Sequence, residues 1–430
     1  MAVLTKEGCK NIKENIIGEQ SIEVLKNRFT DYYLSIETKK GNEITENVQN
    51  SIKEKVDSVF DKIKHIVIPT NVEEFNFNSF ISKQSNLTEE QKQAALSSIP
   101  NIKKVLNNEM PCKIFSPAIV EAMGFDYNEV YIKGQYIPKP GEKYQEFLDK
   151  ITSTYYENTD GSNIKGMNAH EQNLKNMAEA NEISTFDAQY YYGQLNNSAG
   201  FCDQNSFNKI RIVINAGEHN SVSGMIHEHL HAMAYHETED GFASGFNTSR
   251  EKSQYGYRKY QLFNEVVNQY LTNKVHKTFS EEDFAKFGIK KSNDNIYNAY
   301  IPLMENFLEE YETDLVDNLM SENPMAFQDL IGKDNFETIV DKLNTVQGKM
   351  DFRYYDNTTI VDFMQAKLNQ KDPNFLNGQT LSLTFIKDNI DYFKTTFGYN
   401  QDIMIALNNM SDLENTCNKV TQNHQNQERY

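Results

Sequence analysis

Proline and glycine are scarce in this chain, and this scarcity restricts the folds that it can adopt. Among 430 residues only 9 are proline and 20 are glycine. A fold made of many short strands needs such turn residues at close intervals, whereas long helices need few of them. The scarcity therefore predicts long helices, and together with the strand described below the expected fold is α+β and predominantly α-helical. A chain of this length is expected to form about two or three domains, or one large one.

Apolar periodicity divides the chain into three regions. From Asn11 to about Ile66, apolar residues recur at three- and four-residue intervals, which predicts helices. The chain after about residue 275 has the same helical character. Between these regions, short β-branched runs and turn-rich stretches are more frequent. We therefore predict a helical N-terminal region over residues 1–110, a mixed region over 111–280 and a helical C-terminal region over 281–430.

The acidic balance of the chain argues against two classes of partner. With 43 Lys and Arg against 61 Asp and Glu, the formal net charge is -18. Binding of nucleic acid needs an excess of basic side chains, as does docking on an anionic membrane, so neither is expected. No stretch reaches the roughly 18 apolar residues of a spanning helix, so membrane insertion is not expected either. The sequence does not indicate an oligomeric state.

The first residues lack the apolar core of a conventional export signal. This predicts a cytoplasmic protein, or one secreted by a route that needs no such signal. The four cysteines, Cys9, Cys112, Cys202 and Cys417, form no C-x-x-C pair, so a thiolate zinc site is not expected. Reduced thiols are favoured, and up to two disulfides are the alternative.

Residues suited to metal chemistry are concentrated in one short stretch. Five of the 9 histidines lie between residues 219 and 236, and the string His227-Glu228-x-x-His231 is among them. On a helix, residues i and i+4 lie one turn apart on one face, so these two imidazoles can meet one metal ion. Glu228 lies beside them, where it can act on a metal-bound water.

The residues around this string predict the strand and the helix that position it. Residues Lys209–Asn215 alternate polar and β-branched side chains, which predicts a strand. Asn220 and Ser221 are both suitable N-caps for the helix that follows. Within that helix His229 points away from the other two histidines, because two residues span about 200°. We expect it to pack, to support a ligand or to face solvent, and not to bind the metal.

A catalytic zinc ion needs a third protein ligand, and the chain offers candidates downstream. Glu265 is favoured, because apolar residues follow it at helical spacing and a second helix could place its carboxylate opposite the first. Asp240 is a weaker alternative, and Glu237 is expected to support a ligand imidazole or to belong to a solvated turn. His236 and His219 are not expected to be ligands.

Together these segments resemble the gluzincin pattern of zinc metallopeptidases. The H-E-x-x-H string is followed by Asn264-Glu265-x-x-Asn268, and in gluzincins a Glu on the next helix is the third zinc ligand. The second segment is also similar to the L-N-E-x-x-T-E-Y-L-T stretch of uncharacterised bacterial gluzincin-like proteins. This chain differs from that stretch at Phe263 and at Asn268-Gln269.

The resemblance implies a zincin-like metallopeptidase domain over residues 111–280 and Zn2+ as the cofactor. His227, His231 and Glu265 would hold the zinc ion, and Glu228 would be the general base. This ligand set leaves a fourth position on the metal for water.

Two further roles can be assigned, the first from the resemblance and the second from the residues that precede Glu265. In zincins an edge strand upstream of the active-site helix pairs with extended substrate, and the strand over Lys209–Asn215 has that place; an ordinary core or edge strand is the alternative. Tyr257 is our candidate for stabilising the oxyanion, because it lies about two turns before Glu265 if the helix continues. A packing tyrosine is the alternative for this residue.

These features favour a zinc metallopeptidase, a gluzincin-like endopeptidase that hydrolyses a peptide or protein substrate. Such a peptidase could act as a bacterial effector or toxin that cleaves a protein substrate. The alternative is a helical interaction or effector protein with a structural or vestigial zinc site and no proteolysis. A fourth protein ligand that closes the metal site, for example Asp240, would favour this alternative.

Overall fold

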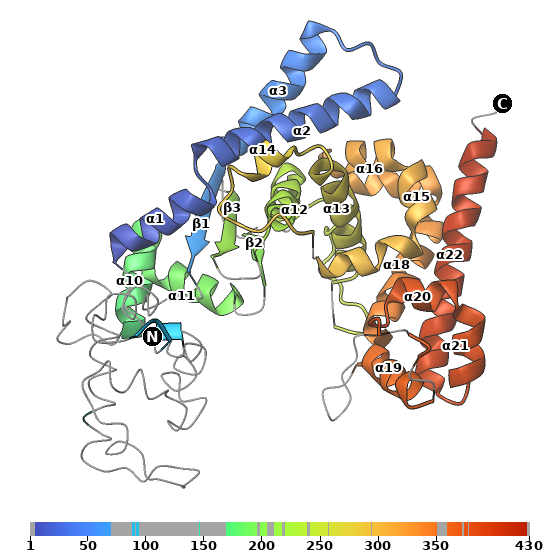
Figure 1. The fold of residues 1–430 in the computed structure, drawn as a ribbon. Helices are drawn as coiled ribbons and strands as arrows, with labels where there is room; N and C mark the ends of the chain where they lie inside the picture. Colours follow the sequence, from blue (N-terminus) through green and yellow to red (C-terminus); the bar gives the residue numbers. More distant parts are fainter. Residues whose placement is uncertain are drawn as a thin grey trace. The chain divides into compact units, whose positions relative to one another are not determined.

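Figure 1 shows the fold of the chain as a computed structural model. The structure describes residues 5–69, 88–90, 92–93, 146, 169–195, 198–203, 210–216, 220–238, 241–256, 258–293, 295–350, 359–371, 374–376 and 378–427. Over these residues the chain is predominantly helical with two small sheets, which confirms the coarse fold class.

The chain divides into two compact units that alternate along the sequence. Unit 1 comprises residues 1–16, 66–199 and 214–219, and unit 2 comprises residues 17–65, 200–213 and 220–430. The predicted boundary after residue 110 lies outside the described residues, so the division into three regions stays a prediction.

Unit 1 contains α1 (Lys6–Ile16), α10 (Ala169–Asn181) and α11 (Thr185–Gln194), and α1 packs against α10. Asn181, the last residue of α10, is 1% exposed. Its side chain accepts a hydrogen bond from the Val67 N–H over 3.2 Å and donates one to the Val67 carbonyl over 3.1 Å. One buried asparagine therefore satisfies both backbone groups of that residue.

Three strands form the larger sheet, with β3 (Ile210–Asn215) between β1 (Ile63–Ile68) and β2 (Gly200–Asp203). The predicted strand is thus confirmed from Ile210 onward. Two expectations are wrong. The helical pattern does not continue to Ile66, because the β-branched residues at its end pair with β3. β3 is also not an edge strand, since β1 and β2 flank it.

Two helices lie side by side in unit 2, α12 (Val222–Met233) and α13 (Gln261–His276) (Figure 1). α12 begins at a predicted N-cap, where the Ser221 hydroxyl accepts a hydrogen bond from the Gly224 N–H over 3.1 Å. α13 is buried along most of its length, and its buried polar side chains are Asn264, Asn268, Gln269 and Thr272. Such groups need hydrogen-bond partners, and these partners shape the site described below.

An antiparallel hairpin of β4 (Tyr235–Thr238) and β5 (Gly241–Ser244) lies between these helices in the sequence. Gly245 follows it with φ +52°, and a Cβ there would lie 2.5 Å from Oδ1 of Asn264. That oxygen accepts a hydrogen bond from the Phe246 N–H over 2.9 Å. Glycine is required here, because the turn is left-handed and approaches α13 closely.

A helical hairpin of α2 (Glu19–Lys39) and α3 (Glu46–Phe60) also belongs to unit 2 (Figure 1). The short helix α14 (Glu281–Phe284) is tied to it by an ion pair between Arg28 and Asp283, with Nη2 and Oδ2 2.9 Å apart. Since α14 follows α13 closely, this ion pair links the hairpin to the centre of the unit.

The described residues after α14 are helical, as predicted. In chain order they form η2 (Ile296–Ala299), η3 (Ile301–Leu303), α15 (Glu305–Glu310), α16 (Glu312–Leu319), η4 (Pro324–Ala326), α17 (Phe327–Ile331), α18 (Lys333–Met350), α19 (Ile360–Lys371), α20 (Leu383–Asp388), α21 (Ile390–Phe397) and α22 (Gln401–Gln427). Pro302 and Pro324 stand in first turns, where a proline costs no helical hydrogen bond. Among the described helices, none combines the length and apolar character that crossing a bilayer requires.

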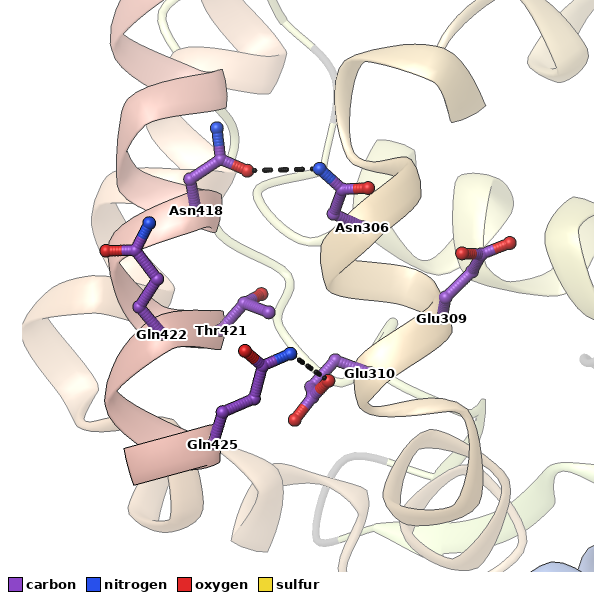
Figure 2. A pocket seen from close by; sticks show the side chains of 7 residues that line it. All are labelled: Asn306, Glu309, Glu310, Asn418, Thr421, Gln422 and Gln425. Carbon is purple, nitrogen blue, oxygen red and sulfur yellow. Dashed lines mark hydrogen bonds between the residues drawn. The ribbon is translucent and has the colours of Figure 1, made fainter. Parts of the chain in front are cut away.

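A polar groove lies between α15 and α22, as Figure 2 shows. Its volume is about 400 Å³, and its lining residues are Asn306, Glu309, Glu310, Asn418, Thr421, Gln422 and Gln425. Asn306 donates a hydrogen bond to Asn418 over 3.4 Å, and Gln425 donates one to Glu310 over 2.8 Å. Here α22 is held to α15 by polar contacts, whereas along its length it packs on α18.

Glu312, the first residue of α16, is a buried carboxylate that joins three helices. Only 4% of the residue is exposed. Its oxygens accept hydrogen bonds from the hydroxyls of Tyr32 in α2 over 3.0 Å and Tyr270 in α13 over 3.3 Å. Nζ of Lys39 lies 2.9 Å away and Nζ of Lys274 3.5 Å away. Burial alone would raise the pKa of Glu312, but the two lysines and Tyr32 hold it below its usual value.

We predict that Glu312→Gln lowers the free energy of unfolding by about 2 kcal/mol at pH 7, because two buried hydroxyls and two ammonium groups lose their anionic partner. A carboxyl group with a lowered folded-state pKa stabilises above its unfolded pKa, and this stabilisation is lost as the pH falls through the folded pKa. The difference between wild type and variant should therefore shrink below about pH 4. Urea unfolding at pH 7 and pH 4 measures it.

Glu309→Gln, on the exposed side of α15, is the control and should leave stability within about 0.5 kcal/mol of the wild type. Equal stability of Glu312→Gln and the wild type at pH 7 would contradict the assigned role.

Candidate metal centre

Three side chains from two helices converge at one point in unit 2. On α12, Nε2 of His227 and Nε2 of His231 lie 3.1 Å apart. Oε2 of Glu265, on α13, lies 3.0 Å from the first nitrogen and 3.2 Å from the second. The structure thus brings together the histidine pair and the downstream glutamate that the sequence singled out.

The spacing of these atoms suits a small cation. Ligands held 2.0–2.1 Å from a tetrahedral zinc ion are roughly 3.3 Å apart, close to the separations found here. His227 is 2% exposed and His231 6%, so little water can solvate their lone pairs. Two imidazole nitrogens and a carboxylate oxygen at such short range repel one another unless a proton or a metal ion lies between them.

The charges of the cluster support the same conclusion. Burial alone would raise the pKa of Glu265, but the two neighbouring imidazoles hold it well below its usual value. Burial also acts to lower the pKa of His231, yet the Glu265 carboxylate outweighs it and the net shift is upward. The site therefore attracts positive charge, and His, His and Glu form a donor set that fits zinc.

Two side chains orient His231. Its Nδ1 lies 3.1 Å from Oγ of Ser244 and 2.7 Å from Nδ2 of Asn268. The Ser244 hydroxyl donates its own proton to the His231 carbonyl over 2.8 Å, so its lone pairs can accept an N–H from the ring. A histidine that binds metal through Nε2 carries its proton on Nδ1 and needs such an acceptor.

Asn268 can serve the same proton after a half-turn of its amide. In the present orientation Nδ2 faces His231, and Oδ1 is buried with no hydrogen-bond partner. The two ends of an amide have nearly the same shape, and a half-turn exchanges them. In the turned orientation, Oδ1 of Asn268 would accept a hydrogen bond from the Nδ1–H of His231 and would no longer lack a partner. Metal binding at Nε2 of His231 therefore favours that orientation.

His227 is held in a different way. Its Nδ1 is buried and has no hydrogen-bond partner. Its ring lies nearly parallel to the ring of Tyr297 in η2, with centroids 5.9 Å apart and planes inclined by 14°. It also meets the His231 ring edge-on at 4.8 Å. Ring contacts thus take the place of a hydrogen bond at this ligand.

Glu228 lies beside the cluster and is not one of its three members. It is half-buried on α12, and the backbone of Cys202 in β2 lies beside its carboxylate. Burial raises the pKa of Glu228, and the nearby imidazoles of His227 and His231 only partly offset this. A carboxyl group with a raised pKa holds a proton more readily than an ordinary glutamate, which suits a group that takes up and returns a proton.

His229 points away from the cluster, as predicted, and is a packing residue. It is fully buried, with its ring stacked on Phe60 at 5.0 Å. Its Nδ1 lies 2.7 Å from the Met225 carbonyl, and its Nε2 lies 2.9 Å from Nε2 of His65. Burial lowers the pKa of His229 to about 4, so the ring is neutral and Nε2 accepts a hydrogen bond from His65.

The competing ligand candidates do not join the cluster where the structure describes them. His236 and Glu237 lie on β4, and Nδ1 of His236 lies 3.1 Å from the Ala234 carbonyl. His219 and Asp240 are outside the described residues.

Tyr257 is also outside the described residues, so its role as an oxyanion donor stays a prediction. One premise of that prediction is wrong, because α13 begins at Gln261 and the helix does not extend back to Tyr257. The preceding chain is non-helical at Arg258, which forms an isolated β-bridge with Lys252.

Sequence reasoning assigned no role to Ser244, Asn268 or Tyr297. Asn268 follows Glu265 by three residues, and helical spacing could have placed it on the same face. Ser244 and Tyr297 come from a hairpin and a 3-10 turn, and no local pattern connects either of them with the H-E-x-x-H string.

Comparison with protein-family models, with curated proteins and with solved structures finds no match to this chain. Metal binding is therefore inferred from the residues of this chain themselves.

We predict that the wild-type protein binds one zinc ion per chain and that His227→Ala, His231→Ala and Glu265→Ala each lose it, because each removes one of three ligands. Elemental analysis after dialysis gives the metal content. His424→Ala is a matched control, since His424 forms a comparable histidine–carboxylate contact with Glu310, 3.0 Å long and on other helices. Unchanged metal content in Glu265→Ala would rule out this site.

We also predict that Asn268→Leu raises the zinc dissociation constant about 10- to 100-fold, because His231 loses an acceptor for its ring proton. Asn268→Asp places a carboxylate oxygen here, which can accept the ring proton, and should bind zinc at least as tightly as the wild type. Competition with a chromophoric chelator measures both. Asn344→Leu, which removes another buried asparagine hydrogen-bonded to a backbone carbonyl, is the control and should not change zinc affinity.

Proposed function

We propose that this protein is a zinc-dependent metallopeptidase of the gluzincin type. The observation that carries the proposal is the convergence of His227, His231 and Glu265 within 4.8 Å of one another, with Glu228 directly beside them. A cluster of three ligands leaves a position for water, whereas a structural zinc site usually has four protein ligands. Among the described residues no fourth His, Cys, Asp or Glu belongs to the cluster.

Zinc bound by these three residues would acidify a water molecule and polarise the peptide carbonyl. The Glu228 carboxylate takes the proton of the attacking water and returns it to the nitrogen of the leaving amine. The raised pKa of Glu228 suits it to both steps, since it can be deprotonated in one and protonated in the other. Tyr257 remains our candidate for a donor to the developing oxyanion.

The contact between Glu228 and Cys202 suggests where a peptide lies. β2 pairs with β3 on one side, which makes it an edge strand of the three-stranded sheet, and α12 packs against it. We propose that extended substrate adds to the edge of β2 that faces away from β3. In this proposal β2, and not β3, is the strand that pairs with substrate.

The alternative function is a helical interaction or effector protein whose metal site is structural or vestigial. This alternative requires a fourth protein ligand on the metal, or a Glu228 that takes no part in proton transfer. A half-buried Glu228 with a raised pKa, outside the ligand cluster, favours the peptidase over this alternative.

We predict that Glu228→Gln lowers kcat for peptide cleavage about 10²- to 10⁴-fold and leaves zinc content unchanged, because the amide cannot carry the proton. A peptide library analysed by mass spectrometry identifies a substrate, and the metal content is measured on the same preparations. Glu237→Gln, an exposed glutamate on β4, is the control and should retain wild-type activity. Zinc binding without cleavage of any peptide by the wild type would favour the structural alternative.

A further inference from the structure

The segment that carries Tyr297 is fastened to both helices of the metal centre. We call residues 290–293 and 295–299 the η2 segment. At its start, the Lys290 carbonyl accepts a hydrogen bond from the Val222 N–H in the first turn of α12, over 2.9 Å. Lys291 follows, and its carbonyl lies 3.0 Å from Nε2 of His276 at the end of α13. The segment thus begins with one anchor on each helix.

Carboxamide side chains hold the middle of the η2 segment. Oδ1 of Asn293 accepts hydrogen bonds from the Ser223 hydroxyl on α12 and from Nε2 of Gln269 on α13, the latter over 3.2 Å. Nδ2 of Asn293 donates to Oδ1 of Asn273 on α13 over 2.7 Å. Ser223 and Gln269 are fully buried, so their ends of these hydrogen bonds lie away from water.

The same network continues to the residue after Tyr297. Nδ2 of Asn273 donates to Oδ1 of Asn298 over 2.9 Å, and Nδ2 of Asn298 donates to the Asn293 carbonyl over 2.7 Å. The Tyr297 N–H donates to Oδ1 of Asn295 over 3.0 Å. The backbone on both sides of Tyr297 is therefore fixed relative to α12 and α13.

We infer that Tyr297 is a positioning residue for the metal ligand His227, and that the carboxamide network exists to hold its ring in place. This role rests on the proposed metal centre. His231 has Ser244 and Asn268 at its Nδ1, whereas the buried Nδ1 of His227 has no hydrogen-bond partner. Without a partner at Nδ1, the imidazole could turn about its Cβ–Cγ bond and carry Nε2 away from the metal.

The flat ring of Tyr297 opposes that rotation. It lies nearly parallel to the imidazole, with the ring centroids 5.9 Å apart, so it limits rotation of the His227 ring toward that side. Offset stacking is a favourable arrangement for two such rings, and it adds attraction to the steric restraint. The two ligand histidines are thus oriented by different means, His231 by hydrogen bonds and His227 by stacking.

Zinc affinity measured by chelator competition tests this role, with the cobalt(II) absorption spectrum as a second readout of ligand geometry. Tyr297→Leu should raise the zinc dissociation constant at least about 10-fold and alter the cobalt spectrum. Tyr297→Phe keeps the ring, so its affinity and spectrum should stay close to those of the wild type. Asn298→Ala, which loosens the network without removing the ring, should have an intermediate effect.

Tyr392→Leu is the matched control, because Tyr392 is a half-buried tyrosine stacked on Phe375 at 4.6 Å, on elements that carry no metal ligand. It should not change zinc affinity. Wild-type affinity in Tyr297→Leu would overturn the role of Tyr297 while leaving the metal centre intact. Equal losses in Tyr297→Phe and Tyr297→Leu would overturn positioning by the ring. A wild type that binds no zinc would overturn the metal centre and this role together.

Discussion

The packing of α12 against α13 is the constraint on which the candidate site depends. α12 supplies His227 and His231 on one face, but a helix cannot supply the carboxylate that lies opposite them. Glu265 reaches them only because α13 crosses at a distance where its Oε2 lies 3.0 Å and 3.2 Å from the two nitrogens. A rotation of either helix by a fraction of a turn would separate these atoms, so the elements that fix the helix pair also fix the site.

Polar side chains of α13, most of them buried, provide much of that fixation. Asn264 holds the turn after β5, Asn268 faces His231, and Gln269 and Asn273 hold the η2 segment. Each of these amides would destabilise the core if it had no partner, so each restricts what can pack beside it. In this protein the carboxamides that form hydrogen bonds on the buried faces of α13 also orient the residues around the three-ligand cluster. Stability and site geometry are therefore coupled through one helix.

The extent to which the fold was predictable differs between elements. The strand over Ile210–Asn215, the Ser221 N-cap and the helix bearing Glu265 all have local signals, and they are where those signals indicate. The strand Ile63–Ile68 was missed, because its apolar residues also fit a helical pattern and only pairing with β3 decides between the two. The β4–β5 hairpin was missed as well, since its strands have four residues each.

For the site, the spacing of His227, Glu228 and His231 determined by itself that two imidazoles share a helix face with a carboxylate beside them, because helical geometry is local. The sequence also determined that Glu265 is a suitable partner on a later helix. Only the tertiary structure decided that these groups meet, that β2 and not β3 is the edge strand beside α12, and that Tyr297 stacks on His227. Those outcomes depend on long-range packing and hydrogen bonds, such as the one between Ser223 and Asn293, which are 70 positions apart. No local periodicity encodes such contacts, since they arise only when separate elements enter one core.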